Sequence, residues 1–431
     1  MLFVQPNAGS FTMLPTDLAC SVPGGVADAL PIPVGLRHAL AEAADELRLA
    51  LVGGAVRDWL LHRVHRDPWR GLPDLDLAVE DLAGAADPAA HRLARALQAA
   101  DPAAVGFCRF HGAYGTVELE LHGVLLDLAT ARAETYPCPA ENPVVSSGRL
   151  EDDLARRDFS INAMALLLQP GGEALLLDPH GGQADLAARR LRLLHDHSLR
   201  DDPTRLVRGA RYGARLGFTL DPASLAQARG TLAAWPWPWR PGDPPEQAPP
   251  ALGTRLRMEL ELLLEREPWP AALALLQAWG GLALLDADLQ ADPNWRHRLR
   301  RAQRLGLPLL PALLGGAADP VALAARLQLP HSQQRWLAQW RQLRACLPPA
   351  AEAVHWLPSR WCALLEGHGR SPEAVALAIA AGDGPRRPLL RWWLHWRHVA
   401  APLSAVELMA GEGLRPGPAL GERLRQLRAE C

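Results

Sequence analysis

Lysine is absent from this sequence, so all 45 basic residues among its 431 are arginines. Any phosphate that the protein binds must therefore be held by guanidinium groups or by backbone amides. The net charge is only −2, but residues 287–431 hold 19 arginines against 11 acidic side chains, so residues 1–286 carry an acidic excess of ten. This division suits a protein whose acidic N-terminal part binds metal ions and whose basic C-terminal part binds a polyanion. On charge alone, however, the arginines of residues 287–431 are better explained as solvated helix surfaces than as a polyanion site.

Cysteine pairs and long apolar runs are also missing. The six cysteines form no CxxC motif and have no histidine at zinc-site spacing, which argues against structural zinc and against a disulfide framework. No apolar run approaches the length of a membrane span, and residues 1–20 lack the basic segment and apolar block of a signal peptide. We therefore expect a cytoplasmic protein that does not enter membranes.

Strand patterns gather in the first third of the chain. Residues 34–47 have helical spacing, residues 49–52 read as a short buried strand, and residues 115–121 and 124–130 read as a β-hairpin around His122 and Gly123. After about residue 150, helical patterns predominate apart from a short strand signal at 174–178. The pattern predicts an α+β protein with several domains. In order, we expect a poorly ordered leader (1–30), a head (31–150), a helical neck (151–230), a Pro/Trp-rich insertion (235–250), a helical body (251–345) and a helical tail (346–431).

Three aspartates are the candidates for catalysis. Asp74 and Asp76 flank one leucine in a strand-like context, and alternate residues of a strand project from the same face. Asp127 lies in a second predicted strand. Carboxylates from neighbouring strands are what two magnesium ions about 3.5–4 Å apart require, one to activate a hydroxyl and one to hold a triphosphate. An isolated DxD is more often a solvated strand end, so the assignment depends on the motifs that accompany it.

Two further motifs predict phosphate and sugar binding. Gly53 and Gly54 stand at a strand-to-helix turn, where backbone amides can approach a phosphate and Arg57 can add a fork of donors. In RRDFSINAMA, Arg157 can neutralise phosphate and Asp158 can accept a hydrogen bond from a ribose hydroxyl. The sequence places Asn162 one helical turn after Asp158, where it either supports the sugar or caps a neighbouring element.

A fourth motif, DDPTRLVRGARYGARLGF, predicts recognition of the base. Asp202 and Arg205 are three residues apart on an expected helix, so they share a face. A carboxylate acceptor beside a guanidinium donor matches adenine and cytosine, and it is inverted for uracil and guanine. Such a site can reject the inverted pattern by roughly 10⁴ to 10⁵. Arg208 and Arg211 follow Arg205 at three-residue spacing and could reach the triphosphate. Arg211 is also consistent with a row of surface ion pairs.

In this order, the four motifs resemble those of class II tRNA nucleotidyltransferases and bacterial poly(A) polymerases, over residues 51–267. The resemblance implies a polymerase-β-like head with a mixed sheet, followed by all-α neck, body and tail domains, the latter of which bind tRNA. Two positions depart mildly from the family, since Asp127 and Asp201 stand where glutamate is common. Residues 130–144 are similar to the A-adding branch, which completes an end begun by a separate CC-adding enzyme.

The resemblance implies a magnesium-dependent enzyme that transfers nucleoside monophosphate from ATP and CTP to the 3′ end of tRNA and releases pyrophosphate. The sequence leaves open whether it adds CCA, CC or only the terminal A, and neither DNA nor a membrane is an expected partner. A poly(A) polymerase is the nearest alternative, but the chain lacks a long basic tail. An inactive RNA-binding protein is disfavoured by the intact carboxylates. A phosphohydrolase centred on His195 and Asp196 is disfavoured because no second metal-binding cluster accompanies them.

Overall fold

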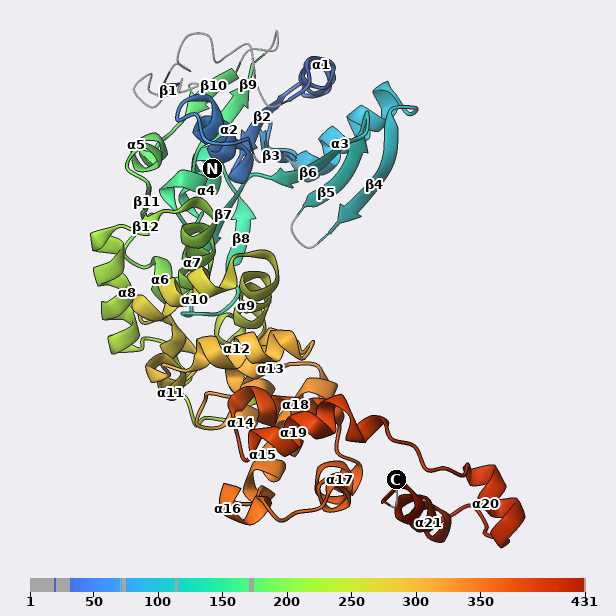
Figure 1. The fold of residues 1–431 in the computed structure, drawn as a ribbon. Coiled ribbons are helices and arrows are strands. Elements are labelled where there is room, and N and C mark those ends of the chain that lie inside the picture. The colour runs from blue at the N-terminus through green and yellow to red at the C-terminus, as the bar shows by residue number, and fades with distance from the viewer. Residues whose placement is uncertain are drawn as a thin grey trace, which may run out of the picture. The chain divides into compact units, whose positions relative to one another are not determined.

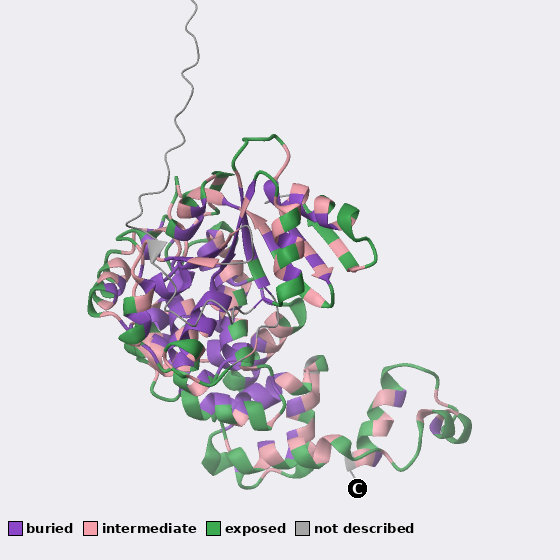
Figure 2. Cartoon of the chain, turned by 90° about the horizontal axis from the view of Figure 1, so that it is seen from above, coloured by how far each residue is buried: buried purple, intermediate pink, exposed green. Residues whose placement is uncertain are grey.

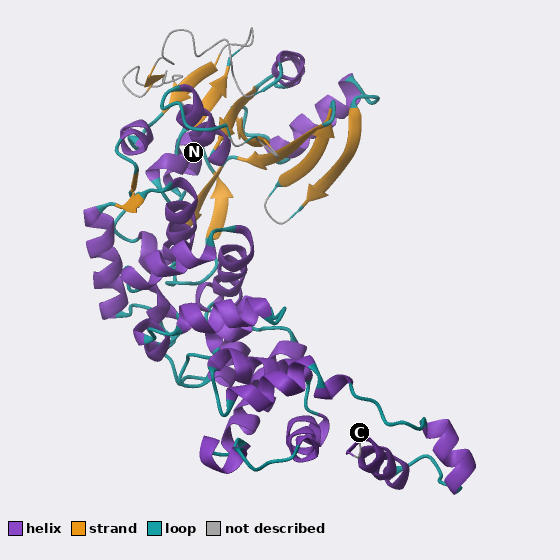
Figure 3. Ribbon diagram, viewed as in Figure 1, coloured by secondary structure: helices purple, strands orange, loops and turns teal. Residues whose placement is uncertain are grey.

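The chain forms two compact units, Met1–Trp237 and Pro238–Cys431. The computed structural model describes residues 19–20, 32–69, 71, 75–112, 115–169 and 174–429. Within those ranges every strand belongs to the first unit, and the second is built from helices (Figure 3). None of the helices described there has both the length and the apolar character needed to cross a membrane. The predicted leader lies outside the described residues, except for Ala19–Cys20.

A mixed eight-stranded sheet is the centre of the first unit (Figure 1). Its strand order is β1-β10-β9-β2-β3-β6-β5-β4. The neighbours β3 and β6 run parallel, and the other pairs are antiparallel. The predicted mixed sheet is confirmed. The strands are β1 (Ala19–Cys20), β2 (Leu47–Val52), β3 (Leu75–Asp81), β4 (Val105–His111), β5 (Thr116–Leu121), β6 (Val124–Thr130), β9 (Ala165–Leu168) and β10 (Ala174–Leu177).

The predicted hairpin is β5 and β6. His122 and Gly123 both have positive φ, 51° and 75°, as the two central residues of a tight hairpin turn require. Along β5, buried and half-buried residues alternate, so one face of the strand is covered. Helix α3 (Ala89–Ala100) packs against β3, β5 and β6. The opposite face is covered in part by α4 (Leu150–Ala155), whose leucines join a cluster with residues of β2, β3 and β9.

The segment that follows α4 departs most from the predicted helix. Asp158 precedes a three-residue 3₁₀ helix, η3 (Ser160–Asn162), and the chain then enters β9, so no α-helix carries Asp158 and Asn162 on one face. β9 pairs with both β2 and β10, so the head sheet extends into the segment expected to be a helical neck. Periodicity alone cannot assign an apolar run as short as Ala165–Leu168, and pairing on both edges decides it.

Helices and two small sheets complete the first unit. The predicted helix over 34–47 is shorter, because α1 spans Val34–Ala43 and β2 begins at Leu47. The Pro/Trp-rich segment begins with Trp235 and Trp237, whose rings meet edge to face, and the Trp237 indole nitrogen donates to the Arg200 carbonyl at 3.0 Å. The remaining elements are α2 (Gly54–Arg63), β7 (Arg132–Thr135), β8 (Val144–Ser147), α5 (Gly182–Ala187), β11 (Arg190–Leu191), α6 (Ser198–Asp201), α7 (Thr204–Leu216), β12 (Thr219–Leu220) and α8 (Pro222–Ala234).

The second unit is organised around α18 (Pro372–Ala381), in which residues Ala374 to Ala380 are all buried. Figure 2 colours the described residues by burial and shows the buried ones gathered within the packed strands and helices. Helix α18 packs against α12 (Trp295–Arg304) and α15 (His331–Cys346). Eight of the 13 tryptophans from Trp235 onward are buried, so most of them serve the core. The other elements are η4 (Pro245–Gln247), η5 (Pro250–Leu252), α9 (Thr254–Arg266), α10 (Trp269–Ala278), η6 (Gly281–Leu284), α11 (Ala287–Ala291), α13 (Leu309–Leu314), α14 (Pro320–Arg326), α16 (Ala350–Ala353), α17 (Pro358–Glu366), η7 (Gly367–Gly369), α19 (Arg386–Leu394), η8 (Trp396–His398), α20 (Ala405–Glu412) and α21 (Pro418–Ala429).

Candidate active site

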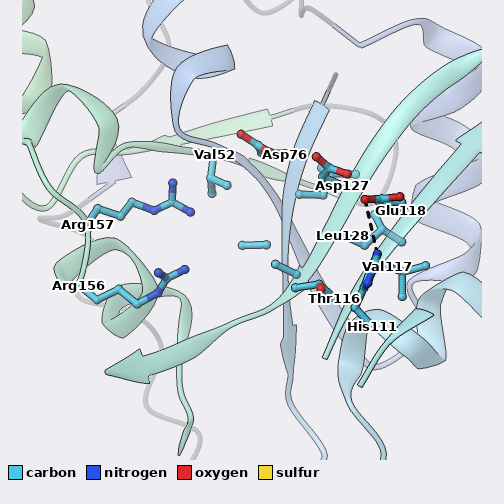
Figure 4. A pocket seen from close by; sticks show the side chains of 13 residues that line it. Val52, Asp76, His111, Thr116, Val117, Glu118, Asp127, Leu128, Arg156 and Arg157 are labelled. Carbon is cyan, nitrogen blue, oxygen red and sulfur yellow. Dashed lines mark ion pairs between the residues drawn. The ribbon is translucent and has the colours of Figure 1, made fainter. Parts of the chain in front are cut away.

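A cavity of about 370 Å³ lies on the face of the sheet that α3 leaves open. Its lining divides by charge. Asp76, Asp127 and Glu118 come from three adjacent strands, and Arg156 and Arg157 approach from the end of α4 (Figure 4). A cavity with carboxylates on one wall and guanidinium groups on the other can hold a cation and a polyanion side by side.

The strand register brings the carboxylates together. Asp76 of β3 is paired with Asp127 of β6, so the two side chains project from the same face of neighbouring parallel strands. Both residues are exposed at the cavity, and Figure 4 shows both carboxylates directed into it. Asp74, the other member of the predicted pair, lies outside the described residues. The structure therefore brings together two of the three predicted catalytic aspartates.

Glu118 is a cavity residue that the sequence analysis missed. It is paired with Asp127 across the hairpin, which extends the row of carboxylates to a third strand. Its carboxylate accepts from Arg109 at 3.2 Å and lies 3.5 Å from Nε2 of His111, so it is part of an ion-pair group at the rim. The signal was present in the sequence, because a two-residue turn at His122 and Gly123 sets the register that places Glu118 opposite Asp127.

Gly53 lies where the arginine wall meets the carboxylates. It has φ of 71° and directly precedes α2, which begins at Gly54. A Cβ atom at Gly53 would lie 3.0 Å from Nη1 of Arg157 and 3.7 Å from Oδ2 of Asp76. Glycine is thus needed here both for its backbone conformation and for the close approach of Arg157. The predicted turn after the first buried strand is confirmed.

One buried carboxylate positions both arginines of the cavity. Asp153, whose side chain is 1% exposed, accepts from Nη2 of Arg156 at 2.6 Å and from Nη2 of Arg157 at 2.8 Å. Burial raises the pKa of Asp153, but the charges and hydrogen bonds of Arg157 and Arg156 lower it by more, so the pKa lies below its usual value. Arg156 also bonds to Glu134 at 3.0 Å. Asp153 gave no signal in the sequence beyond its spacing from the two arginines.

Four of the residues predicted to bind phosphate or ribose, Arg57, Asp158, Asn162 and Arg208, form one hydrogen-bonded network. Arg57 is buried and donates from Nη1 to Asn162 at 2.8 Å and from Nε to Asp58 at 2.8 Å. Asn162 donates to Asp158 at 3.0 Å, and Nε of Arg208 donates to the other oxygen of Asp158 at 2.7 Å. Asp158 is therefore surrounded by donors. Burial raises its pKa, but Arg208 and Asn162 lower it by more, which keeps Asp158 ionised.

Asp202 and Arg205 do not share a helix, contrary to the prediction. Asp202 lies between α6 and α7 in an extended conformation, with φ −141° and ψ 96°, because a residue before proline avoids the helical region. Its Oδ1 accepts from the backbone and hydroxyl of Thr204 at 3.0 and 2.6 Å. Arg205 is the second residue of α7, and Arg208 and the half-buried Arg211 follow it at three-residue spacing.

Arg156 connects this second group of residues to the cavity. Its side chain lines the cavity, and its carbonyl accepts from Nη2 of the buried Arg205 at 2.9 Å. The structure thus brings nine of the thirteen predicted site residues together in two adjoining parts. Asp76, Asp127 and Arg157 line the cavity with Gly53 beside them, and the network of Arg57, Asp158, Asn162, Arg205 and Arg208 is attached through residues 156–158.

Comparisons with known proteins identify the family of this chain. Residues 49–192 match the family described as the Poly A polymerase head domain. The CC-adding tRNA nucleotidyltransferase of Deinococcus radiodurans is 38% identical over 373 residues, a match that covers 80% of this chain and 84% of that protein. The chain belongs to the tRNA nucleotidyltransferase family.

Two further relatives describe the range of this nucleotidyltransferase family. The A-adding tRNA nucleotidyltransferase of Halalkalibacterium halodurans is also 38% identical, but the match covers 45% of this chain and only 42% of that protein. The solved structure of a CCA-adding enzyme in its apo form II superposes on this chain with a TM-score of 0.71 at 23% sequence identity. The match covers 94% of this chain and 93% of that enzyme. The fold of the head sheet and the helices that follow is therefore that of a CCA-adding enzyme.

Proposed function

We propose that this nucleotidyltransferase extends the 3′ end of tRNA without a template, using CTP and ATP, and that it works in the cytoplasm. The observation that carries the proposal is the in-register pair Asp76 and Asp127 in a cavity whose other wall is Arg156 and Arg157. We infer that C addition is part of its activity, because the match to the CC-adding relative extends over 80% of the chain, against 45% and 62% for two A-adding relatives. The products CC and CCA both satisfy this inference.

Magnesium fits the carboxylates of the cavity. Oxygen ligands are what this cation prefers, and it is usually held by one or two carboxylates together with substrate phosphates. Asp76 and Asp127 provide two such groups on one face. Within the described ranges no three His, Cys, Asp or Glu side chains are grouped as a metal site, and the predicted third ligand, Asp74, is outside those ranges. Bound magnesium would supply a Lewis acid for the attacking hydroxyl and the triphosphate.

The side chains then have separate roles in the transfer. The 3′ oxygen of tRNA forms a bond to the α-phosphorus of the nucleotide as the bond to the β-phosphate oxygen breaks, and pyrophosphate leaves. Arg157, beside the carboxylates, is placed to bind the triphosphate. Ionised Asp158 is assigned to the ribose, and Asp202 with Arg205 to the base, where protein side chains replace a template. Arg57, Asn162 and Arg208 hold Asp158 in place.

The proposal is tested by supplying each nucleotide separately. Transcripts of tRNA that lack CCA, CA or A are incubated with one labelled nucleotide at a time, and the products are resolved at single-nucleotide length. We expect CTP to extend the transcript without CCA by two residues. Addition of a single A to the transcript ending in CC defines a CCA-adding enzyme. Long A tails on every RNA would replace the proposal with poly(A) polymerase activity.

Arg205→Ala should weaken discrimination between nucleotides more than it weakens nucleotide binding. The guanidinium is assigned to a base edge, and a buried charged hydrogen bond is worth about 1.5–3 kcal/mol. We therefore expect the kcat/KM ratio of CTP over UTP to fall by about 10- to 100-fold with a smaller change in KM. The check is steady-state incorporation on the transcript without CCA. An unchanged ratio would reassign Arg205 to a structural role.

Arginines of the second unit should make tRNA binding depend on salt. Removing the predicted tail, residues 346–431, would be the direct test, but this deletion also removes α18, which forms the core of the second unit. Exposed Arg386, Arg387 and Arg391 of α19 offer a milder test. Each phosphate contact contributes roughly 0.9 to the log–log salt slope on duplex DNA and roughly 0.7 on single strands. Replacing all three by glutamine should lower the slope by about two to three and leave KM for ATP unchanged.

The matched control replaces Arg95 and Arg190, which are exposed and paired with carboxylates in the first unit. This variant should keep the wild-type slope, measured as tRNA affinity between low and moderate salt. A slope near zero in the unmodified protein would mean that the arginines of the second unit form only a solvated surface.

A further inference from the structure

His195 lies against Arg205, the arginine assigned to the base. It stands in the short segment between β11 and α6 and is exposed, whereas Arg205 beside it is buried, with 5% exposed. Nη1 of Arg205 and Nε2 of His195 are 3.3 Å apart. A guanidinium has five donor hydrogens and no acceptor, so the ring nitrogen must accept this bond and must carry no proton.

The backbone around His195 is held from two sides. Its amide donates to Oγ of Ser198 at 3.3 Å, and its carbonyl accepts from the Ser198 amide at 3.1 Å. The amide of Gln227, on α8, donates to the carbonyls of His195 and Asp196 at 3.0 and 2.6 Å. The imidazole therefore projects from a segment anchored to both α6 and α8, which is what a side chain needs in order to fix the orientation of another.

Two uncharged acceptors hold the end of Arg205. Nη2 donates to the carbonyl of Arg156 at 2.9 Å, and Nη1 donates to His195. Together they fix the plane of the guanidinium, because each terminal nitrogen has one anchor. Three N–H groups are left for other partners. Loss of either anchor lets the plane rotate about the remaining one, which would misalign the donors that the base must meet.

We propose that His195 is a positioning residue for base selection: its neutral imidazole holds Arg205 in the orientation that reads cytosine or adenine, and its protonation releases Arg205. This inference rests on the function proposed above for Arg205. An imidazolium cannot accept the hydrogen bond, and it places a second positive charge beside the guanidinium. Selection between bases should therefore depend on pH within the pH range in which the enzyme still incorporates nucleotides.

The charges around His195 keep it neutral at pH 7. Burial of part of the ring lowers its pKa, and Arg205 on α7 lowers it further; Asp201 on α6 and Asp196 raise it, and His197 lowers it. The residue that faces it from α8, Gln227, is uncharged. The net shift is below the ordinary histidine value of about 6.5. Selection should therefore be complete at neutral pH and be lost as the pH falls below the ordinary histidine range.

The experiment measures the kcat/KM ratio of CTP over UTP between pH 5.5 and 8.0, on the tRNA transcript without CCA. A ratio cancels every titration that both nucleotides share. In the unmodified protein the ratio should fall as the pH drops below the ordinary histidine value of about 6.5, toward a value about tenfold lower, which is the worth of one hydrogen bond to a charged group. His195→Gln retains an acceptor that does not titrate, so its ratio should not change with pH. His195→Ala should show the low ratio throughout.

His197→Gln is the matched control, because His197 is an exposed histidine of the same segment with no hydrogen bond to Arg205. Its profile should follow that of the unmodified protein. A ratio that does not change with pH in the unmodified protein, or a His195→Gln variant that keeps the pH dependence, would overturn the proposal.

A second readout needs no turnover. NMR titration of the His195 ring should show a higher pKa in Arg205→Ala, because the guanidinium that lowers it has been removed. A higher His195 pKa in Arg205→Ala, in a protein that incorporates no nucleotide, would establish the contact between His195 and Arg205 and would reject the proposed function. If the unmodified protein incorporates nucleotides but the His195 pKa is the same in Arg205→Ala, the proposed function stands and the proposed role of His195 is rejected.

Discussion

Asp76→Ala should abolish nucleotide incorporation while tRNA still binds. Asp76 is exposed in the cavity, is paired with Asp127, and lies beside Arg157. Loss of this carboxylate removes a ligand for the cation that stabilises developing charge on the phosphate, a contribution of several kcal/mol. We expect kcat to fall on the order of 10³-fold or more. Asp74→Ala, which the sequence pairs with Asp76, should have the same effect.

The control for this experiment is Asp87→Ala, which removes a surface carboxylate from the same unit. Asp87 pairs with Arg95, and both side chains are largely exposed, so the pair contributes little. The three variants are compared by incorporation assay and by tRNA binding without nucleotide. Retained turnover in both Asp74→Ala and Asp76→Ala would rule out the catalytic assignment, and loss of tRNA binding in Asp76→Ala would indicate a folding defect.

Asp153→Ala should be among the most destabilising single substitutions in the chain. It leaves Arg156 and Arg157 without their shared carboxylate in a site where Asp153 itself is 1% exposed. Breaking a buried ion pair by removing one partner costs about 3–5 kcal/mol. We expect a loss of that size in the free energy of unfolding, measured by urea denaturation. Any protein that remains folded should bind nucleotide weakly, because Arg157 loses its anchor.

The same carboxylate predicts how stability varies with pH. The pKa of Asp153 is lowered in the folded protein, so its contribution is complete above the ordinary aspartate value of about 4 and is lost as the pH falls through the lower, folded value. Asp152→Ala is the matched control. Asp152 is exposed on the same helix, where its side chain accepts from the Arg149 amide at 2.8 Å, and its removal should cost about 1 kcal/mol or less. Equal losses in the two variants would contradict the assignment.

Local features that the sequence determined include the strand before Gly53 and the tight hairpin around His122 and Gly123. Each depends on a short-range rule. Alternation along a strand sets which side chains share a face, and a two-residue turn sets the pairing of the strands it joins. Even Glu118 could have been found in this way. The basic excess of residues 287–431 did not by itself distinguish a polyanion site from solvated helix surfaces.

Tertiary structure decided the contacts between segments distant in sequence. Arg57 meets Asn162 across 105 positions, and Arg208 meets Asp158 across 50, so neither contact follows from local spacing. β9 is a strand because β2 and β10 pair with it on both sides. Asp202 leaves the helix because Pro203 follows it, a local rule that the helical spacing of Asp202 and Arg205 obscured. The sequence determined which chemical groups this enzyme has and the local turns that present several of them. The packing of distant elements decided which groups are buried, paired and held in place, because burial and electrostatic pairing depend on neighbours that local sequence does not identify.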